Sequence, residues 1–368
     1  MTKILFVSTN LSSSFHGGWQ CSNRNLESVR TIFGADNVDV ELLEPFSHNH
    51  RPIFSSILMM LSSFFRLILT FRMNGSNLGI ENKIITRIAQ NKYKFVFVDS
   101  SLNGLLVKKI RKRTESRIVS FFHNCEYAFI KSLVNSGDIK SVLRLLPCYL
   151  NEKFSVKYAH KVIALNTRDK SLIEELYKVN KTVDIIPISL FDRVSDESSL
   201  VSNKLPSKLS VLFVGSNFYA NTQGILWFIN EVFPFVDIDL KIVGKDMDKL
   251  IIPHQDNILV YGTVPSVEQF YIDADLVVAP VFAGGGMKVK IAEALMYGKV
   301  IIASEEALQG YQLVDSMVEC KTSKDFIEAF AKFDLSGYNV ESRNLFKKTY
   351  SFEATLLEFK KIFILENN

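Results

Sequence analysis

The stretch GGGMKVKIAEALMYG, Gly284 to Gly298, follows the apolar run DLVVAP, Asp275 to Pro280. An apolar run, three glycines and then helical periodicity predict a buried strand, a tight loop and a helix. Three consecutive glycines let backbone N–H groups approach a ligand with no side chain in between. The positive end of the helix dipole lies at the same place, so the pattern predicts an anion site.

Charged side chains complete this predicted site. Lys288 and Lys290 flank the turn and add formal positive charge. Glu293 lies about 7 Å beyond Lys288 at the rise of an α-helix, and its carboxylate can accept two hydroxyls. The pattern therefore favours a nucleotide sugar, with its diphosphate on the loop and its ribose on the acid. A plain tight turn with a solvated lysine is the alternative, since the sequence lacks the GK[ST] and GxGxxG signatures.

Composition indicates a globular protein of two domains. The chain has 368 residues, 47% hydrophobic and 22% charged. Its net charge of +4 is divided unevenly: residues 1–200 carry 27 Lys and Arg against 18 Asp and Glu, whereas residues 201–368 carry 16 against 21. The basic half, which includes KKIRKR (Lys108–Arg113), predicts an anionic partner such as a membrane surface or an acidic acceptor. A solvated helix face is the alternative, and no nucleic acid is expected.

Two further features bear on location. The cysteines are widely separated and lack zinc spacing, which fits a reduced, cytoplasmic compartment; they are Cys21, Cys125, Cys148 and Cys320. The 19-residue apolar segment Ile53–Phe71 contains Arg66, which is costly inside a bilayer. We expect a helix packed in the amino-terminal domain, with an interfacial helix touching lipid as the alternative.

Short apolar runs alternate with segments of helical periodicity along the whole chain. The expected strands are Ile4–Ser8, Val38–Leu43, Phe95–Asp99, Arg117–Phe122, Lys161–Leu165, Thr182–Ile186, Leu209–Gly215, Asp239–Val243, Ile258–Tyr261, Leu276–Ala279 and Val300–Ala303. Helices are expected between them, for example at Gly224–Val232 and Val267–Ala274. This alternation predicts an α/β protein with two Rossmann-like, doubly wound domains that face a cleft.

The domain boundary is expected in the polar, Ser-rich segment Phe191–Lys208. Residues 1–203 would form an acceptor domain and residues 204–349 a donor domain. A carboxyl-terminal helix within residues 350–368 would return to the first domain. The chain start, MTKILFVSTN, is expected to be a buried strand because its apolar run is too short for a signal peptide.

Three segments together resemble the carboxyl-terminal half of GT-B glycosyltransferases, nearest to the GT4-like bacterial enzymes of capsule and lipopolysaccharide assembly. They are FVGSNFYANTQGILWFINEVFP (Phe213–Pro234), the ADLVVAP strand and GGGMKVKIAEALMYGKVIIAS (Gly284–Ser304). The amino-terminal half is similar in pattern, with HGGWQ (His16–Gln20) and SFFHNCEY (Ser120–Tyr127) at the corresponding places.

The resemblance implies transfer of a sugar from a nucleotide-diphosphate sugar to a glycan or lipid-linked acceptor, with retained anomeric configuration. Glu293 matches the second Glu of the family's E-x7-E motif, whereas Gly285 stands where the first would be. The family's Arg and Lys after the first strand of this domain are also missing, with Ser216 and Gln223 in that loop. The diphosphate would then depend on Lys288 and the glycine backbone.

The implied donor-binding residues, besides Lys288 and Glu293, are Gly215, Asn221, Gly262, Thr263, Val264, Gly284, Gly285, Gly286 and Met287. The turn at Gly262–Val264 would hold the nucleobase through main-chain groups. The implied catalytic residues are His123, Lys288 and Glu293, with His123 at the donor sugar or its leaving group.

The first loop supplies the remaining candidates. Gly17 and Gly18 would let the acceptor or the diphosphate approach the backbone, and His16 is either part of this loop site or simply exposed. Asp99, at a strand end, is either a further candidate or a helix cap before Ser100.

The resulting prediction is a cytoplasmic enzyme, peripheral to the inner face of the plasma membrane where it meets lipid. No cofactor or metal is expected, because no Asp-x-Asp pair accompanies the glycine loop and Lys288 can balance the phosphate charge. A non-catalytic nucleotide-sugar-binding partner protein and a UDP-sugar epimerase of the same fold are the alternatives.

Overall fold

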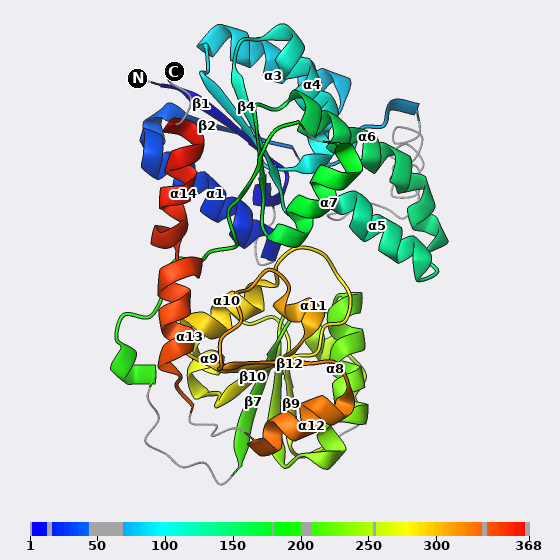
Figure 1. Ribbon diagram of the computed structural model, residues 1–368, viewed down its shortest axis with the longest axis vertical. Helices are drawn as coiled ribbons and strands as arrows, with labels where there is room; N and C mark the ends of the chain where they lie inside the picture. The colour runs from blue at the N-terminus through cyan, green and yellow to red at the C-terminus, as the bar shows by residue number, and fades with distance from the viewer. Residues whose placement is uncertain are drawn as a thin grey trace. The chain divides into compact units, whose positions relative to one another are not determined.

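The computed structural model describes residues 2–12, 17–43, 69–178, 180–200, 208–252, 255–332 and 337–364. The chain forms two compact units, each built on a parallel sheet with helices on both faces (Figure 1). The first unit comprises Met1–Ser14, Gly18–Ile186 and Glu358–Asn368. The second comprises Phe15–Gly17 and Pro187–Leu357. The predicted fold class, α/β with two doubly wound halves, is confirmed.

The first sheet has six parallel strands in the order β2-β1-β3-β4-β5-β6. The strands are β1 (Ile4–Ser8), β2 (Val38–Leu42), β3 (Phe95–Val98), β4 (Arg117–Phe122), β5 (Lys161–Ala164) and β6 (Val183–Ile185). Its helices are α1 (Gly17–Phe33), α3 (Leu78–Asn91), α4 (Gly104–Arg113), α5 (Glu126–Asn135), α6 (Val142–Tyr158) and α7 (Thr167–Tyr177). All six predicted strands of this half are present, within one residue at each end.

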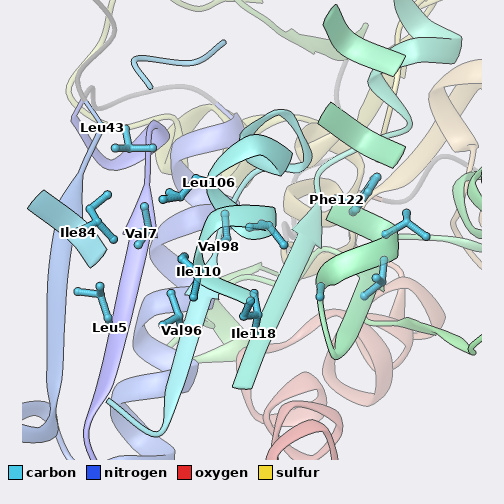
Figure 2. Packing of buried hydrophobic residues seen from close by; sticks show 14 of the residues in the cluster. Leu5, Val7, Leu43, Ile84, Val96, Val98, Leu106, Ile110, Ile118 and Phe122 are labelled. Atoms are coloured by element: carbon cyan, nitrogen blue, oxygen red, sulfur yellow. The ribbon is translucent and has the colours of Figure 1, made fainter. Parts of the chain in front are cut away.

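The two faces of this sheet bury different side chains, as the two-residue period of a strand requires. One face carries aliphatic residues, among them Leu5, Val96 and Ile118, which pack against helices α3 and α4 (Figure 2). The opposite face carries Phe6, Phe97 and Phe121 from three neighbouring strands; the Phe6 and Phe97 rings stack at 5.0 Å and those of Phe97 and Phe121 at 6.2 Å.

The second sheet has the order β12-β11-β10-β7-β8-β9, again entirely parallel, which is the strand order of a Rossmann domain. Its strands are β7 (Leu209–Val214), β8 (Ile238–Val243), β9 (Ile258–Tyr261), β10 (Leu276–Ala279), β11 (Val300–Ser304) and β12 (Met317–Cys320). The sequence analysis missed β12. This edge strand is only four residues long and carries the half-exposed Glu319, so its pattern is weak.

The helices of the second unit are α8 (Tyr219–Glu231), α9 (Glu268–Asp273), α10 (Val289–Met296), α11 (Glu305–Leu308), α12 (Ser323–Lys332) and α13 (Val340–Leu345), followed by a π-helical turn at Phe346–Tyr350 and α14 (Phe352–Ile364). Short 3-10 turns lie at Asn10–Ser12, Ala35–Asn37, Ser101–Asn103, Ile139–Ser141, Glu197–Leu200, Phe233–Phe235 and Met247–Lys249. Helix α8 begins at Tyr219, five residues before the predicted start at Gly224, so the polar stretch before that glycine is part of the helix.

Gly224 fixes the position of helix α8 against the loop that follows β10. A Cβ atom at this residue would lie 1.7 Å from the backbone oxygen of Pro280. Only glycine allows the helix backbone to approach the loop this closely. The loop after β10 therefore rests directly on the first half of α8.

The carboxyl-terminal helix α14 is divided between the units: its residues up to Leu357 belong to the second unit and those from Glu358 to the first. Its start packs on the second unit, where the Ser189 and Thr355 hydroxyls are 2.6 Å apart and the Phe191 and Phe352 rings stack. Its end returns to the phenylalanine face of the first sheet, where Phe363 contacts the Phe33 and Phe95 rings edge-on.

The segment 187–200 is tied to the second unit by Arg343, a buried residue of α13. Its guanidinium donates to both carboxylate oxygens of Asp192, at 2.9 and 2.6 Å, and to Glu197 at 3.1 Å. The predicted boundary at 203/204 falls within residues 201–207, which are outside the described residues. Most of the apolar segment Ile53–Phe71 is outside them as well. Within the described ranges, no helix is long and apolar enough to cross a membrane.

Candidate functional site

The candidate site of the second unit lies where the strand order reverses. The chain proceeds from β7 to β8 and β9 on one side, and then to β10 on the other side of β7. Loops that leave β7 and β10 therefore separate at their carboxyl ends, which is where open parallel sheets bind ligands. The glycine loop before α10 and the loop before α8 are these two segments.

The glycine loop needs its glycines. Gly284 and Gly286 have φ values of +136° and +60°, which side chains rarely adopt. The Lys288 ammonium folds back over this loop and lies 3.2 Å from the Gly286 oxygen and 3.5 Å from the Gly285 oxygen. It also forms an ion pair with Glu306 at 2.8 Å. Lys288 therefore sits on the predicted loop, but beside a carboxylate that the sequence analysis did not consider.

Lys290 points to the other loop of the site. Its ammonium donates to Asn221 Oδ1 at 2.9 Å and lies 4.3 Å from the centre of the Phe213 ring. Asn221 in turn donates to the Ser216 oxygen at 3.0 Å. Burial, followed by repulsion from Lys288, lowers the pKa of Lys290 to about 7. A bound anion would favour the charged form of Lys290, so anion binding and protonation of Lys290 would stabilise each other.

Asn221 also explains the glycine after β7. A Cβ atom at Gly215 would lie 2.9 Å from the Asn221 side chain. Gly215 and Asn221, both predicted donor-binding residues, are thus in contact with each other and, through Asn221, with Lys290.

Glu293 is a buried acid of α10, 5% exposed. Its Oε2 accepts a hydrogen bond of 3.0 Å from the hydroxyl of Tyr271 on α9. The Tyr271 ring stacks on Tyr297 with centroids 5.2 Å apart. Burial and the nearby Glu293 charge raise the pKa of Tyr271, so the hydroxyl remains a donor to the carboxylate. Tyr271 therefore fixes the direction in which Glu293 presents its oxygens.

The remaining donor-binding candidates lie at the same sheet edge. Met287 is buried at the end of the glycine loop. Gly262, Thr263 and Val264 follow β9, two strands away from β7, and a Cβ atom at Gly262 would lie 2.5 Å from an Asp248 carboxylate oxygen. The structure thus places the turn at the carboxyl edge, where a ligand that extends from the glycine loop would reach it.

The first unit has its own cluster at the carboxyl ends of β1 and β3, where its strand order reverses. Asp99 is fully buried and accepts from the Ser8 hydroxyl at 2.8 Å and from the Asn25 amide at 2.7 Å. His123 Nε2, just after β4, lies 3.3 Å from Asp99 Oδ1 and 3.3 Å from Asn10 Nδ2. The alternative that Asp99 caps a helix is wrong, because Ser100 caps the 3-10 turn at Ser101–Asn103.

The surroundings of His123 favour the charged form of its imidazole. Burial alone would lower its pKa, but the Asp99 carboxylate and the Cys21 side chain outweigh burial and raise the pKa well above its ordinary value. Burial likewise opposes ionisation of Cys21, but His123 and Arg24 outweigh it and lower the thiol pKa. The His123 side chain remains 18% exposed, so it can donate a proton or a hydrogen bond to a ligand.

The glycines of the predicted first loop start a helix instead. Gly17 and Gly18 are the first two residues of α1, so their N–H groups belong to a helix amino terminus. His16 is outside the described residues. No group of three or more His, Cys, Asp or Glu side chains with metal-binding geometry occurs in the described part of the chain.

Sequence reasoning missed four residues of these clusters: Lys290 as a contact of Asn221, and Tyr271, Glu306 and Cys21. Lys290 lies three residues before Glu293, which places both on one helix face. Glu306 is the second residue after strand β11, and ligands of parallel sheets bind at the carboxyl ends of strands. Tyr271 and Cys21 lie in ordinary helical patterns and gave no signal.

Comparisons with known proteins found related sequences and similar folds. The family described as glycosyl transferases group 1 matches residues 208–333, within the second unit. An uncharacterized protein of the cps region of Klebsiella pneumoniae is 24% identical over 95% of this chain and 99% of its own length. An uncharacterized glycosyltransferase of Methanocaldococcus jannaschii is 24% identical over 73% of this chain and 72% of its own.

Solved structures share the fold over the whole chain. The lipopolysaccharide outer core galactosyltransferase WaaB, in its apo form, superposes with a TM-score of 0.65 at 13% identity, covering 99% of this chain and 100% of that one. HepE of Anabaena, in complex with UDP-glucose, gives a TM-score of 0.65 at 12% identity and covers 99% of both chains.

The Asp99–His123 pair leads to a prediction that needs no substrate. Asp99→Asn removes the negative charge opposite the imidazole, so the pKa of His123 should fall. In the wild type, the raised pKa stabilises the fold below the ordinary histidine pKa, and this stabilisation is lost as pH rises through the folded-state pKa.

The measurement is an NMR titration of the six histidine rings, with His123→Ala to assign the signal. Asp36→Asn, which neutralises an exposed carboxylate of the 3-10 turn before β2, is the control and should leave the titration nearly unchanged. An unshifted His123 signal in Asp99→Asn would contradict the pairing.

Proposed function

We propose that the protein is a group 1 glycosyltransferase of the GT-B type and that it transfers a sugar from a nucleoside-diphosphate sugar to a glycan or lipid-linked acceptor with retention of anomeric configuration. Retention and the GT4-like assignment rest on the resemblance of the three sequence segments. The assembly of capsule or lipopolysaccharide is the proposed setting, supported by the relative from a cps region and by the fold of WaaB.

The observation that carries the donor proposal is the pair of lysines at the strand-order reversal. Lys290 reaches Asn221, Lys288 covers the glycine loop, and both approach the carboxyl ends of β7 and β10. A diphosphate bridging these two loops would contact both ammonium groups and the N–H groups at the start of α10. Supporting this placement, HepE, which has the same fold, is known in complex with UDP-glucose.

The rest of the donor follows from this placement. Glu293 lies one turn beyond Lys290 on α10, and its carboxylate, oriented by Tyr271, would accept the ribose hydroxyls. The turn at Gly262–Val264 would hold the nucleobase by its main chain. From the family resemblance, and independently of this placement, we propose that His123 of the first unit acts at the donor sugar or its leaving group, where a positive donor favours departure of the phosphate.

Lys288 is the proposed stabiliser of the leaving phosphate. Its ammonium is fixed by two loop carbonyls and by Glu306, so little reorganisation is needed when charge develops. Two lysines and a helix amino terminus supply the positive charge that a diphosphate needs, and we therefore propose that the transfer requires no metal ion.

The pKa of Lys290 gives the function a test in pH. A bound diphosphate favours the ammonium, so Lys290 must take up a proton on binding wherever it is neutral in the free protein. Affinity for the nucleotide sugar should be constant below pH 7 and should fall above it, by up to about tenfold per pH unit. The measurement is thermal shift and isothermal titration with UDP-, GDP- and ADP-sugars between pH 6 and 9.

Lys290→Arg is the matched control, because arginine stays charged and should flatten the profile. Release of nucleoside diphosphate, measured with and without a glycan acceptor, completes the test of function. Stabilisation without any release would favour the nucleotide-sugar-binding partner, and interconversion of the sugar without release would favour the epimerase. A nucleotide affinity that does not depend on pH or on residue 290 would contradict the diphosphate position.

The ribose proposal is tested by comparing Glu293→Gln with Tyr271→Phe. Tyr271→Phe removes the buried Tyr271–Glu293 hydrogen bond, whereas Glu293→Gln keeps an acceptor for it but makes that acceptor neutral, so both variants should lose stability, by about 1–3 kcal/mol at most. Only Glu293→Gln also removes the charged acceptor of the ribose hydroxyls, so it alone should weaken nucleotide binding, by about tenfold or more. Equal nucleotide affinities in the two variants would show that Glu293 has a structural role. Melting temperature and binding by titration calorimetry are the two measurements.

A surface of the first unit supports a membrane-associated acceptor and a place at the inner face of the plasma membrane. Four exposed apolar side chains follow one another at helical spacing at the start of α6: Ile139, Val142, Leu143 and Leu146. The exposed Lys140 and Arg144 are interleaved with them. In KKIRKR, by contrast, Lys108 packs on the Phe154 ring and Lys109 pairs with Glu81, which leaves Arg111, Lys112 and Arg113 exposed.

The protein should therefore bind vesicles that contain phosphatidylserine, through a salt-sensitive and a salt-resistant component. Basic residues contribute about 1 kcal/mol each near an anionic bilayer, and salt near 1 M screens them within about 3 Å. Apolar side chains contribute the part that resists salt. Vesicle sedimentation at low and high salt measures both.

The double variant Ile139→Ser/Leu146→Ser should lose the salt-resistant component. Ile251→Ser, which changes an exposed apolar residue of the second unit, is the control and should retain it. No sedimentation of the wild type at low salt would remove the membrane from this proposal, and the acceptor would then be a soluble glycan.

A further inference from the structure

Glu306 places a carboxylate inside a site that otherwise attracts anions. Its Oε1 lies 2.8 Å from the Lys288 ammonium, which itself contacts the carbonyls of Gly285 and Gly286. The Glu306 side chain is 21% exposed and that of Lys288 is 12% exposed. Glu306 therefore lies at the wall of the glycine loop, with part of its surface accessible to a ligand.

The position of Glu306 is fixed by the strand before it. Strand β11 pairs with β10 through Ile302 and Ala303. The Ser304 hydroxyl donates to the carbonyl of Val281 and caps α11 by accepting from the Ala307 N–H at 3.3 Å. The residue that carries the carboxylate is thus anchored to the same loop that carries the glycines.

The negative charge of Glu306 opposes the binding of an anion at the glycine loop. A negative charge beside a bound diphosphate repels it, and the ion pair with Lys288 only partly offsets the repulsion. The charge also affects other neighbours, since burial and the Glu306 carboxylate raise the pKa of Tyr219 on α8.

In a nucleotide sugar, the group attached to the diphosphate is a sugar ring that carries several hydroxyls. Residues 280–288 carry no carboxylate, amide or hydroxyl side chain that could accept from them. A carboxylate has two oxygens and about four acceptor positions, so Glu306 can keep its contact with Lys288 and still accept a hydroxyl. Hydrogen bonds to a charged acceptor are the stronger kind.

We propose that Glu306 recognises the donor sugar, accepting its hydroxyls while Lys288 holds the adjoining phosphate. The inference rests on the proposed function and deepens it, because it makes one residue responsible for the preference for a sugar-bearing nucleotide over the bare diphosphate. Glu306 would thus determine which sugars the protein accepts.

The experiment compares two ligands in each variant, a nucleotide sugar and its sugar-free diphosphate, for example UDP-glucose and UDP. Glu306→Gln should weaken binding of the nucleotide sugar by about ten- to a hundredfold. The bare diphosphate should bind with unchanged or higher affinity, since a repulsive charge has been removed. The readout is the ratio of the two dissociation constants, measured by titration calorimetry.

Two further variants keep the result interpretable. Glu305→Gln changes the adjacent, exposed acid, whose nearest cation is Lys321 at 3.8 Å, and should alter neither affinity. Lys288→Met should weaken both ligands together and leave their ratio unchanged. Melting temperatures of all three variants exclude simple unfolding.

Each other outcome overturns the inference in a distinct way. Parallel weakening of both ligands in Glu306→Gln would show that Glu306 acts only through Lys288. Unchanged binding of both would show a structural ion pair. Failure of the wild type to bind any UDP-, GDP- or ADP-sugar or diphosphate would overturn the proposed function itself, and the inference with it.

Discussion

The candidate site of the second unit is constrained by two buried or half-buried ammonium groups two residues apart. Lys288 and Lys290 enter the same site from the start of one short helix, and each is held by a different partner, Glu306 for the first and Asn221 for the second. Burial and repulsion from Lys288 lower the pKa of Lys290 to about 7. An apolar environment would not retain such a pair for stability alone. The arrangement makes sense where a doubly charged ligand restores the balance.

The sequence was sufficient to predict the fold and the glycine loop, because both depend on local patterns. Parallel strands buried on both faces appear as apolar runs, and β7 to β11 were all predicted. Gly284 and Gly286 occur where the chain needs positive φ. The partners of the lysines could not be predicted, since Glu306 and Asn221 lie 18 and 69 residues away from them. Such contacts depend on strand order, which periodicity does not reveal.

The first unit shows the same limit. Strand-end position marked Asp99 and His123 as candidates, and the structure places them side by side, because carboxyl ends of neighbouring parallel strands converge. The structure adds what links them, a buried carboxylate 3.3 Å from the imidazole, together with Cys21 from a helix whose sequence gave no signal. The charge state of His123 is thus a property of three elements distant in the chain. The sequence identifies the residue, but only the packing determines its protonation.

In each unit, a side chain with a strongly shifted pKa lies near the point where the strand order reverses. The pKa of His123 in the first unit is raised, whereas that of Lys290 in the second unit is lowered. The first holds an imidazolium charged by pairing it with a buried carboxylate, whereas the second keeps a lysine near neutrality by burial and a neighbouring cation. A charged donor that is already compensated changes little when ligand binds. A lysine that gains its charge only with the ligand couples binding to proton uptake. The second unit is therefore the one whose affinity should respond to pH in the neutral range.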